Sequence, residues 1–353
     1  MAETLAWGIL GTGSIARTFV QALKKSKTGR LAAIGSRTQA SADRFGDEFQ
    51  APVRHGSYQA LLDDPGVRAV YIATPHPMHA EWAIKAAEAG KHILCEKPLA
   101  TNEADATAMA EAAAKAGVVN MVNLSYRNVA ALQQAARLVR EGAIGAVRHF
   151  EASYLQSWLT QPAWGEWSKE SQWLWRLSTK HGSKGVLGDV GIHILDFATF
   201  IAGLDAVQVS CLLKTFDKAP GGQIGDYVLD ANDSATMQVS LANGALGTVA
   251  ATRFATGHLN DLRLRIYGDK GGLVVGWEKN VSSLSICRGD NVLTGTWEPV
   301  DCPEVPNVYQ RFVAAVRGDA SAAEPDFARG AALQRLLDRA EQSAGQGGLA
   351  LAV

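Results

Sequence analysis

Lys97 stands in the motif Glu96-Lys97-Pro98, directly after the apolar run 92–94. This run predicts a buried strand, so the lysine falls at the carboxyl end of that strand, where open parallel sheets bind ligands. Pro98 restricts Lys97 to extended backbone angles, which helps to fix the direction of its side chain. An ammonium group held in this way can stabilise a substrate oxygen that gains negative charge.

Asp189 and His193 lie four residues apart in a segment, 189–201, that is predicted to be helical. At this spacing both side chains face the same side of a helix. A base that removes a proton from a hydroxyl group needs a pKa near neutrality, and histidine meets that need best. The same pair also occurs in proteins as a solvated pair and occasionally as a metal site. No further cluster of His or Cys supports a metal, so we expect none.

A glycine-rich turn with the pattern G-x-G-x-x-A follows the expected first strand, 5–10, and precedes an expected helix, 14–25. The first glycine of the pattern permits a tight turn, the second lets the backbone approach a pyrophosphate, and the alanine allows close packing of helix on strand. Amides at the helix start can meet the phosphate charge. The alternative is an ordinary turn of an α/β protein. The residues assigned to the cofactor here are Gly11, Thr12, Gly13, Ser14 and Ile15.

The second expected strand, 31–35, ends in Ser36-Arg37-Thr38 and offers no acid for the ribose 2′-hydroxyl of NAD. These three residues can bind the 2′-phosphate of NADP, or Arg37 can lie on the adenine ring or simply face solvent. The expected cofactor is therefore NAD or NADP, and Arg37 favours NADP. The turn after the next strand would cover the ribose and nicotinamide, and its cofactor-binding residues would be Ala73, Thr74, Pro75 and His79.

Five tryptophans lie between Gln156 and Arg176. Flat amphipathic rings stack well on the C–H faces of a sugar, and Lys169 and Arg176 could bind polar groups of such a substrate. The competing interpretation is packing in the core or at a subunit interface, where tryptophan is equally favoured. The tryptophans are Trp158, Trp164, Trp167, Trp173 and Trp175.

The chain has 353 residues, 47% of them hydrophobic and 20% charged, and a formal net charge of −1. Such a charge provides no basic field for nucleic acid or an anionic membrane, so neither is an expected partner. Four scattered cysteines indicate reduced thiols and a cytoplasmic protein. We expect no signal peptide, because the first strand begins by about Leu5, and no apolar run reaches the roughly 20 residues of a membrane helix.

Strand and helix patterns alternate through residues 1–143, as they do in a Rossmann domain, a doubly wound parallel sheet. Strand-like runs dominate from Gly145 onward, which predicts a C-terminal α+β domain, 144–353, with a large, mostly antiparallel open sheet. The boundary is expected near 142–145, and the terminal helix could pack back on the first domain. The expected later strands are 147–154, 207–213, 235–241, 246–252, 262–267 and 272–275; the expected later helices are 128–141, 189–201, 308–317 and 327–344.

The motifs together resemble the glucose–fructose oxidoreductase/inositol dehydrogenase (Gfo/Idh/MocA) family over nearly the whole chain. They occur in the order Ala73-Thr74-Pro75 with His79, residues 89–92 leading into Glu96-Lys97-Pro98, Trp175-Arg176, and Asp189 with His193. The resemblance implies an N-terminal Rossmann domain and a C-terminal domain whose open sheet forms homodimers or homotetramers. It also implies NAD(P)-dependent chemistry on sugars, polyols or their derivatives.

The resemblance further implies roles for individual residues. Lys97, Asp189 and His193 would form the catalytic set, and Glu96, Lys97 and Arg176 would contact the cofactor. The substrate side would include Tyr126, Arg127, Trp164, Trp175 and Arg176, together with the three catalytic residues. The chain departs from the family at Val186-Leu187-Gly188, where a more glycine-rich lead to the aspartate is common.

We therefore expect an oxidoreductase that moves a hydride between NAD(P) and a secondary hydroxyl or ketone of a carbohydrate. An alternative with the same residues is an NAD-dependent oxidoreductive glycosidase, which oxidises a glycoside transiently, eliminates the aglycone, adds water and returns the hydride. Arg176, Lys169, Lys180 and Lys184 would suit a bulky or anionic glycoside. A non-catalytic cofactor-binding regulator is a third class, but it would not need Lys97, Asp189 and His193 together.

Overall fold

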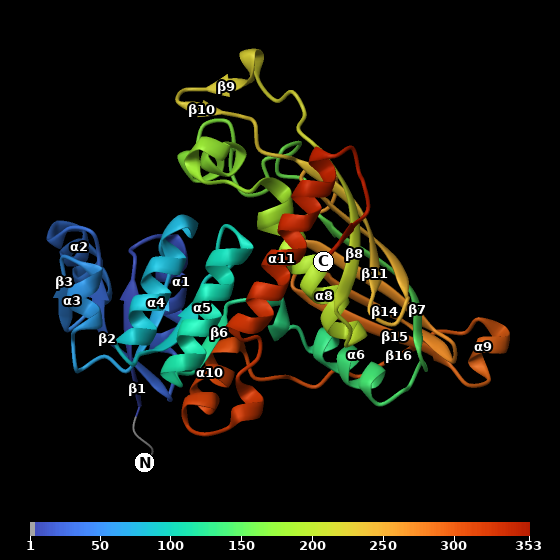
Figure 1. Ribbon diagram of the computed structural model, residues 1–353, viewed down its shortest axis with the longest axis horizontal. Helices are drawn as coiled ribbons and strands as arrows, with labels where there is room; N and C mark the ends of the chain where they lie inside the picture. Colours follow the sequence, from blue (N-terminus) through green and yellow to red (C-terminus); the bar gives the residue numbers. More distant parts are fainter. Residues whose placement is uncertain (1–3) are drawn as a thin grey trace. The chain divides into compact units, whose positions relative to one another are not determined.

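The computed structural model describes residues 4–353, and these form two compact units (Figure 1). One unit contains the residues up to Leu124 and Pro306–Gln334; the other contains Ser125–Val305 and Arg335–Val353. We refer to them as the nucleotide unit and the sheet unit. The division falls after Leu124 and not near 142–145, because helix α6 (Ala130–Arg140) packs on helix α8 (Ile192–Ala202) and on strands of the second unit.

A six-stranded parallel sheet forms the centre of the nucleotide unit, in the order β3-β2-β1-β4-β5-β6. Most of its strands are continuous apolar runs, as expected for a sheet buried on both faces. The strand order reverses beside β1, and ligands of such sheets bind at the carboxyl ends of the strands near this reversal. The strands are β1 Leu5–Leu10, β2 Gly29–Gly35, β3 Val53–His55, β4 Ala69–Ile72, β5 His92–Cys95 and β6 Asn120–Val122.

Helix α1 packs on this sheet through residues at helical spacing, with Ala16, Phe19, Val20 and Leu23 buried. The remaining helices are α2 Gln39–Phe49, α3 Tyr58–Leu62, α4 His79–Glu88, α5 Glu103–Ala116, α10 Val308–Val316 and the first part of α11 Phe327–Gly345; α1 itself is Ser14–Lys24. Short 3-10 turns lie at His76–Met78 and Ala320–Ala322.

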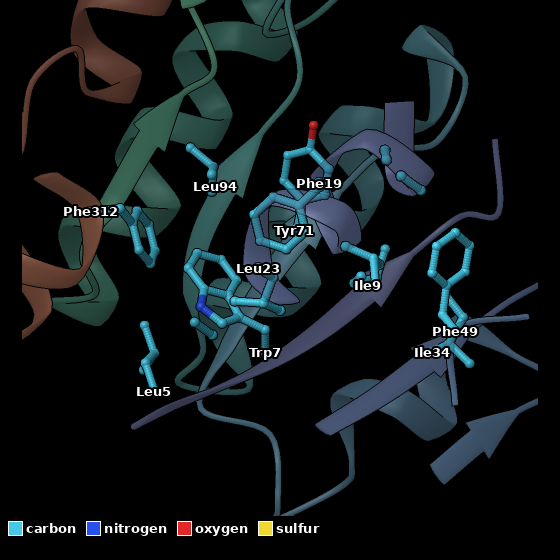
Figure 2. Close-up of a cluster of buried hydrophobic side chains, with 14 of the residues drawn as sticks. Leu5, Trp7, Ile9, Phe19, Leu23, Ile34, Phe49, Tyr71, Leu94 and Phe312 are labelled. Atoms are coloured by element: carbon cyan, nitrogen blue, oxygen red, sulfur yellow. The ribbon is translucent and has the colours of Figure 1, made fainter. Parts of the chain in front are cut away.

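The core of the nucleotide unit joins the two ends of the chain. Phe312 of α10 lies 4.8 Å from the Trp7 ring of β1, between ring centroids, and Trp7 lies 5.0 Å from Phe19. Figure 2 shows these rings with Tyr71 in one buried cluster. Residues after 305 therefore complete the core of the Rossmann unit, although they lie far from it in sequence.

The sheet unit contains a nine-stranded sheet in the order β16-β15-β14-β13-β7-β12-β11-β8-β17. Strands β7 and β12 are parallel, and the sheet's other neighbouring pairs within the described residues are antiparallel. This confirms the mostly antiparallel sheet. The strands are β7 Val147–Leu155, β8 Ala206–Lys214, β11 Ser234–Leu241, β12 Leu246–Thr252, β13 Asp261–Gly268, β14 Gly271–Glu278, β15 Val281–Arg288, β16 Glu298–Pro299 and β17 Leu351–Ala352.

Helices α6 and α8 pack on one face of this sheet (Figure 1). Strand β7 shows the resulting alternation, because Phe150 and Tyr154 are buried whereas Glu151 is exposed. The smaller elements are α7 Ser171–Leu174, α9 Asn291–Thr294, the hairpin strands β9 Gln223–Ile224 and β10 Tyr227–Val228, and 3-10 turns at Ser125–Asn128, Trp175–Leu177, Thr179–His181 and Pro220–Gly222. None of the helices within residues 4–353 combines the length and hydropathy of a membrane span.

The helix expected at 189–201 is built differently from the prediction. A π-helical turn, Leu187–Gly191, leads into α8, and Asp189 lies in that turn while His193 lies in the first turn of α8. A π-turn adds a residue to the helical repeat and is frequent at functional sites. The simple i,i+4 geometry of a regular helix therefore does not describe this pair.

Candidate functional site

The turn after β1 has the geometry of a phosphate-binding loop. Gly11 has a φ of +107°, and a Cβ there would lie 2.6 Å from the Ala73 carbonyl oxygen, so the position requires glycine. A Cβ on Gly13 would meet open space, and Gly13 provides no side-chain cap for α1. The first amides of α1 are thus available to an anion, which fits the pyrophosphate of a dinucleotide.

The turn after β4 lies against Gly11 and offers one further group that could bind the cofactor, the hydroxyl of Thr74. Thr74 Oγ1 is buried and has no hydrogen-bond partner among the described residues. A buried hydroxyl of this kind loses free energy unless a ligand or water satisfies it. Ala73, Thr74 and Pro75 therefore fit contact with a bound cofactor.

His79 does not fit the direct cofactor contact expected for it. Its ring is 0% exposed, and its two nitrogens lie 2.9 Å from the Pro98 carbonyl oxygen and 3.0 Å from that of Thr74. Burial lowers the pKa of His79, so the ring is neutral and donates one hydrogen bond to these carbonyls. His79 links the two turns that carry Thr74 and Lys97, and sequence alone did not reveal these partners.

Glu96, like His79, has a structural role and not the cofactor contact expected for it. Its buried carboxylate accepts hydrogen bonds from the Tyr71 hydroxyl and, at 2.6 Å, from Asn123 Nδ2. Burial raises the pKa of Tyr71 well above its usual value, so this hydroxyl keeps its proton and donates a hydrogen bond to Glu96. Glu96 Oε2 also accepts from the Lys97 backbone amide at 3.3 Å. The network fixes the backbone of Lys97, which precedes a cis peptide bond to Pro98.

The end of β2 presents Arg37 as an exposed side chain. Thr38 is the N-cap of α2 and accepts a hydrogen bond from the Ser41 amide at 3.3 Å, while Ser36 is buried. The Thr38 hydroxyl is therefore already used by the helix. Of the three residues expected to bind the adenosine end, Arg37 is exposed and is not used as a helix cap, so it fits this role best.

Two arginines hold the carboxylate of Asp189 in the sheet unit. Arg176 Nη1 lies 3.1 Å from Oδ1, and Arg253 Nη2 lies 3.2 Å from Oδ2. Arg253 is 0% exposed, donates to the Arg176 carbonyl oxygen at 3.1 Å and lies 5.0 Å from the Trp158 ring centroid. The carboxylate is thus fixed at both oxygens, and Arg176 acts first as its partner. Sequence reasoning missed Arg253, which simply follows β12 and belongs to no motif.

His193 lies among aromatic side chains that can shield it from water. Its ring centroid is 4.9 Å from that of Tyr126 and 6.3 Å from that of Tyr154. Both tyrosines belong to the same unit as Asp189 and His193. The structure therefore brings Tyr126, Asp189, His193 and Arg176 into one compact unit, as expected from their shared motif set.

Arg127 is a structural residue and not the substrate contact that we expected. Its guanidinium is 2% exposed and forms a bidentate ion pair with Asp196 at 2.6 and 2.8 Å. It also lies 3.5 Å from the centroid of the Phe200 ring. Its Nε/Nη2 edge pairs with Asp196 and one face packs on Phe200, and with 2% of the side chain exposed it is buried away from a substrate.

The tryptophan segment forms a small core of its own. Trp158 is buried with Leu159, Leu174, Leu177 and Leu229, and Trp164, Trp167 and Trp173 pack against this cluster. Trp175 lies outside the cluster, and the Arg176 guanidinium lies 4.8 Å from its ring centroid. Packing thus explains most of these tryptophans, including Trp164, and leaves Trp175 as the better candidate for substrate contact.

One group of potential metal ligands appears that the sequence did not suggest. The ligand atoms of His258, Asp261 and Glu278 lie within 4.8 Å of one another. His258 Nδ1 and Asp261 Oδ2 are 2.7 Å apart and form an ion pair when the histidine is protonated. This pairing accounts for two of the three residues, and the absence of a metal stays a prediction.

Two family models match the chain. One, described as the oxidoreductase family with an NAD-binding Rossmann fold, matches residues 5–124, and the GFO/IDH/MocA C-terminal domain matches residues 132–274. Levoglucosan dehydrogenase of Pseudarthrobacter phenanthrenivorans is 35% identical over 253 residues, which are 68% of this chain and 62% of that protein. The 1,5-anhydro-D-fructose reductase of Ensifer adhaerens is 33% identical over 57% of this chain and 58% of its own. These matches span less than two thirds of either relative.

Solved structures match over nearly the full length. An oxidoreductase domain protein from Kribbella flavida superposes with a TM-score of 0.84 and 31% identity, and covers 99% of both chains. Levoglucosan dehydrogenase in complex with NADH and levoglucosan gives a TM-score of 0.84 at 28% identity, with 99% of both chains covered.

Proposed function

Because the chain belongs to the Gfo/Idh/MocA oxidoreductase family, we propose that it is an NAD(P)-dependent dehydrogenase of a sugar, polyol or sugar derivative. The observation that carries this proposal is the group built around Asp189 and His193, in which two arginines fix the carboxylate and aromatic rings surround the imidazole. A regulator that only bound cofactor would need neither feature. The names of the matched relatives support a carbohydrate substrate.

The proposed reaction uses three side chains. His193 takes the proton of a secondary hydroxyl, and the electrons left on the oxygen form the C=O bond as the hydrogen on the carbinol carbon leaves with its bonding pair as hydride. The nicotinamide, when bound, accepts that hydride. Lys97 stabilises the negative charge that develops on the substrate oxygen, and Asp189 orients His193 or contacts a neighbouring hydroxyl. Reduction of a ketone uses the same groups in reverse.

The charges near the tryptophan segment favour an uncharged substrate. Lys169 pairs with Glu166, and Lys184 Nζ lies 3.2 Å from Glu341 Oε2. Arg176 is paired with Asp189. Three of the four cations that would suit an anionic glycoside are thus neutralised within the chain. We therefore favour a dehydrogenase of neutral sugars over the oxidoreductive glycosidase.

A panel of free sugars, anhydrosugars and glycosides, incubated with stoichiometric and excess NAD or NADP, separates these two functions. A dehydrogenase accumulates reduced cofactor in proportion to substrate and releases no aglycone. Release of aglycone over many turnovers without net reduction of the cofactor would identify the glycosidase instead. Cofactor binding with neither outcome across the panel would favour a regulator.

We expect the protein to prefer NADP, because Arg37 is exposed at the end of β2 and no acid stands there. Replacing Arg37 by alanine should lower kcat/KM with NADP about 10- to 100-fold relative to NAD, since charged hydrogen bonds are worth about 1.5–3 kcal/mol. Arg30→Ala, on the same strand, is the matched control. A wild-type preference for NAD that Arg37→Ala leaves unchanged would contradict this assignment.

We propose that two or more copies associate through the exposed face of the nine-stranded sheet. Helices α6 and α8 cover the opposite face, and the exposed face carries a hollow of about 500 Å³. Its lining mixes small polar, apolar and charged residues and includes Leu212, which is 57% exposed. Leu212→Asp should shift the mass measured by light scattering towards the monomer, whereas Leu293→Asp on α9 should not. A wild-type monomer would contradict the proposal.

We propose a cytoplasmic location and a small carbohydrate as the partner, without nucleic acid or membrane. The support is the near-zero net charge and the four cysteines, which are all free thiols, three of them buried. A reducing compartment preserves such thiols. Fractionation of expressing cells would test the location, and secretion into an oxidising compartment would contradict it.

A further inference from the structure

A chain of hydrogen bonds leads from a tryptophan to the neighbourhood of His193. Trp158 Nε1 lies 3.2 Å from Gln156 Oε1, and Gln156 Nε2 lies 2.7 Å from Asn260 Oδ1. The Tyr154 hydroxyl lies 2.8 Å from the same Asn260 oxygen and 2.6 Å from the Tyr126 hydroxyl. All five residues belong to the sheet unit. The Tyr126 ring in turn meets the His193 ring edge-on.

The chemistry of the first group fixes the direction of every bond in this chain. An indole N–H can only donate, so it faces the amide oxygen of Gln156 and the amide nitrogen faces Asn260. That nitrogen also donates, so the facing atom of Asn260 is its oxygen, which can only accept. Tyr154 must therefore give its hydrogen to Asn260. The bond between the two tyrosines is left with one available hydrogen, that of Tyr126.

The protonation of both tyrosines keeps this direction constant. Burial raises the pKa of Tyr126 to about 12, and burial and the neighbouring Tyr126 raise that of Tyr154 well above its usual value. Both hydroxyl groups are thus neutral at physiological pH. Tyr126 donates its only hydroxyl hydrogen to Tyr154, and the described residues supply its oxygen with no donor. The Tyr126 oxygen can therefore accept a hydrogen bond from a ligand but cannot donate one.

We propose that Tyr126 accepts a hydrogen bond from a second substrate hydroxyl, beside the one whose proton His193 takes. The substrate class is then a polyol with a second hydroxyl near the reacting one, and Asn260, Gln156 and Tyr154 are positioning residues that set the polarity of Tyr126. A hydrogen, fluorine, methoxy group or carbonyl at the second position supplies no donor. This proposal rests on the dehydrogenase assignment for the identity of the reacting hydroxyl.

The test compares levoglucosan with its monodeoxy and monofluoro counterparts, in turnover and in calorimetric binding to the NAD(P)H-loaded protein. At one position the wild type should prefer hydroxyl over hydrogen or fluorine by on the order of tenfold, as one neutral hydrogen bond predicts. Tyr126→Phe should abolish that ratio. Asn260→Leu should also reduce it, whereas Asn260→Asp, which keeps an acceptor facing Tyr154, should retain it. The ratio is insensitive to the fraction of protein that is folded.

Equal preference in wild type and Tyr126→Phe, or failure of the wild type to bind levoglucosan, glucose or inositol, would overturn the inference. A wild-type preference for the fluorine analogue at that position would overturn the deduced polarity. Binding with the expected selectivity but without reduction of NAD(P) would contradict the dehydrogenase and leave the acceptor role of Tyr126 standing.

Discussion

Lys97→Ala is expected to lower kcat by about 10²- to 10³-fold and to change the affinity for NAD(P)H little. The ammonium group is proposed to stabilise charge that appears on the substrate oxygen only as the proton and hydride leave. The backbone of Lys97 is held by Glu96, which pairs with Tyr71 and Asn123, so the substitution should not disturb the cofactor edge. Steady-state kinetics and titration of NAD(P)H fluorescence measure the two quantities separately.

The matched control is Lys115→Ala, an exposed lysine in the last turn of α5 in the same unit. It should leave kcat, KM and cofactor affinity near the wild-type values. Lost cofactor binding in Lys97→Ala, with turnover retained at saturating cofactor, would sink the assignment and make Lys97 a cofactor-binding residue only.

His193→Asn should lower kcat about 10²- to 10⁴-fold, the range typical of a positioned general base. Asparagine keeps a polar side chain in the first turn of α8 but cannot take the proton. The variant should retain a slow, hydroxide-dependent rate at most. Steady-state kcat of the wild type and the variant, each measured as a function of pH, checks this.

The control for His193→Asn is His149→Asn on β7, where the histidine is exposed and stacks near Tyr267. Its kcat and pH profile should match those of the wild type. If His193→Asn kept the full rate and the same dependence on pH, another group would be the base, and the pairing with Asp189 would be structural.

The local pattern of apolar and polar residues was sufficient to predict most of the fold. The apolar runs located β1, β4 and β5, because a parallel sheet buries both faces of its strands. Strand β15 was missed although Leu284 and Ile286 are buried at strand spacing, since serines occupy the intervening positions. The turn before it uses positive φ at both Lys279 and Asn280, but its Lys-Asn pair is a weaker sequence signal for a hairpin than Asn-Gly.

The sequence singled out candidate site residues but not their partners. Residue type and spacing pointed to Lys97, Asp189 and His193, whose catalytic roles stay predictions, and the family resemblance assigned Arg127 to the substrate. Its partner Asp196 lies 69 residues further along the chain, and only folding brings the two together. Arg253 was missed for the same reason, since 64 residues separate it from Asp189. The structural role of a charged residue can be predicted from sequence only when its ion-pair partner lies nearby in the chain.

Hydride transfer is tested most directly with a sugar that carries deuterium on the carbinol carbon that is oxidised, incubated with excess NAD or NADP. If the protein is a dehydrogenase, one deuterium should appear in the reduced nicotinamide for each ketone formed, and both products should accumulate together. Deuterium that returns to the sugar product with no net reduced cofactor would reveal the glycosidase cycle. Deuterium that is lost to water would contradict hydride transfer altogether.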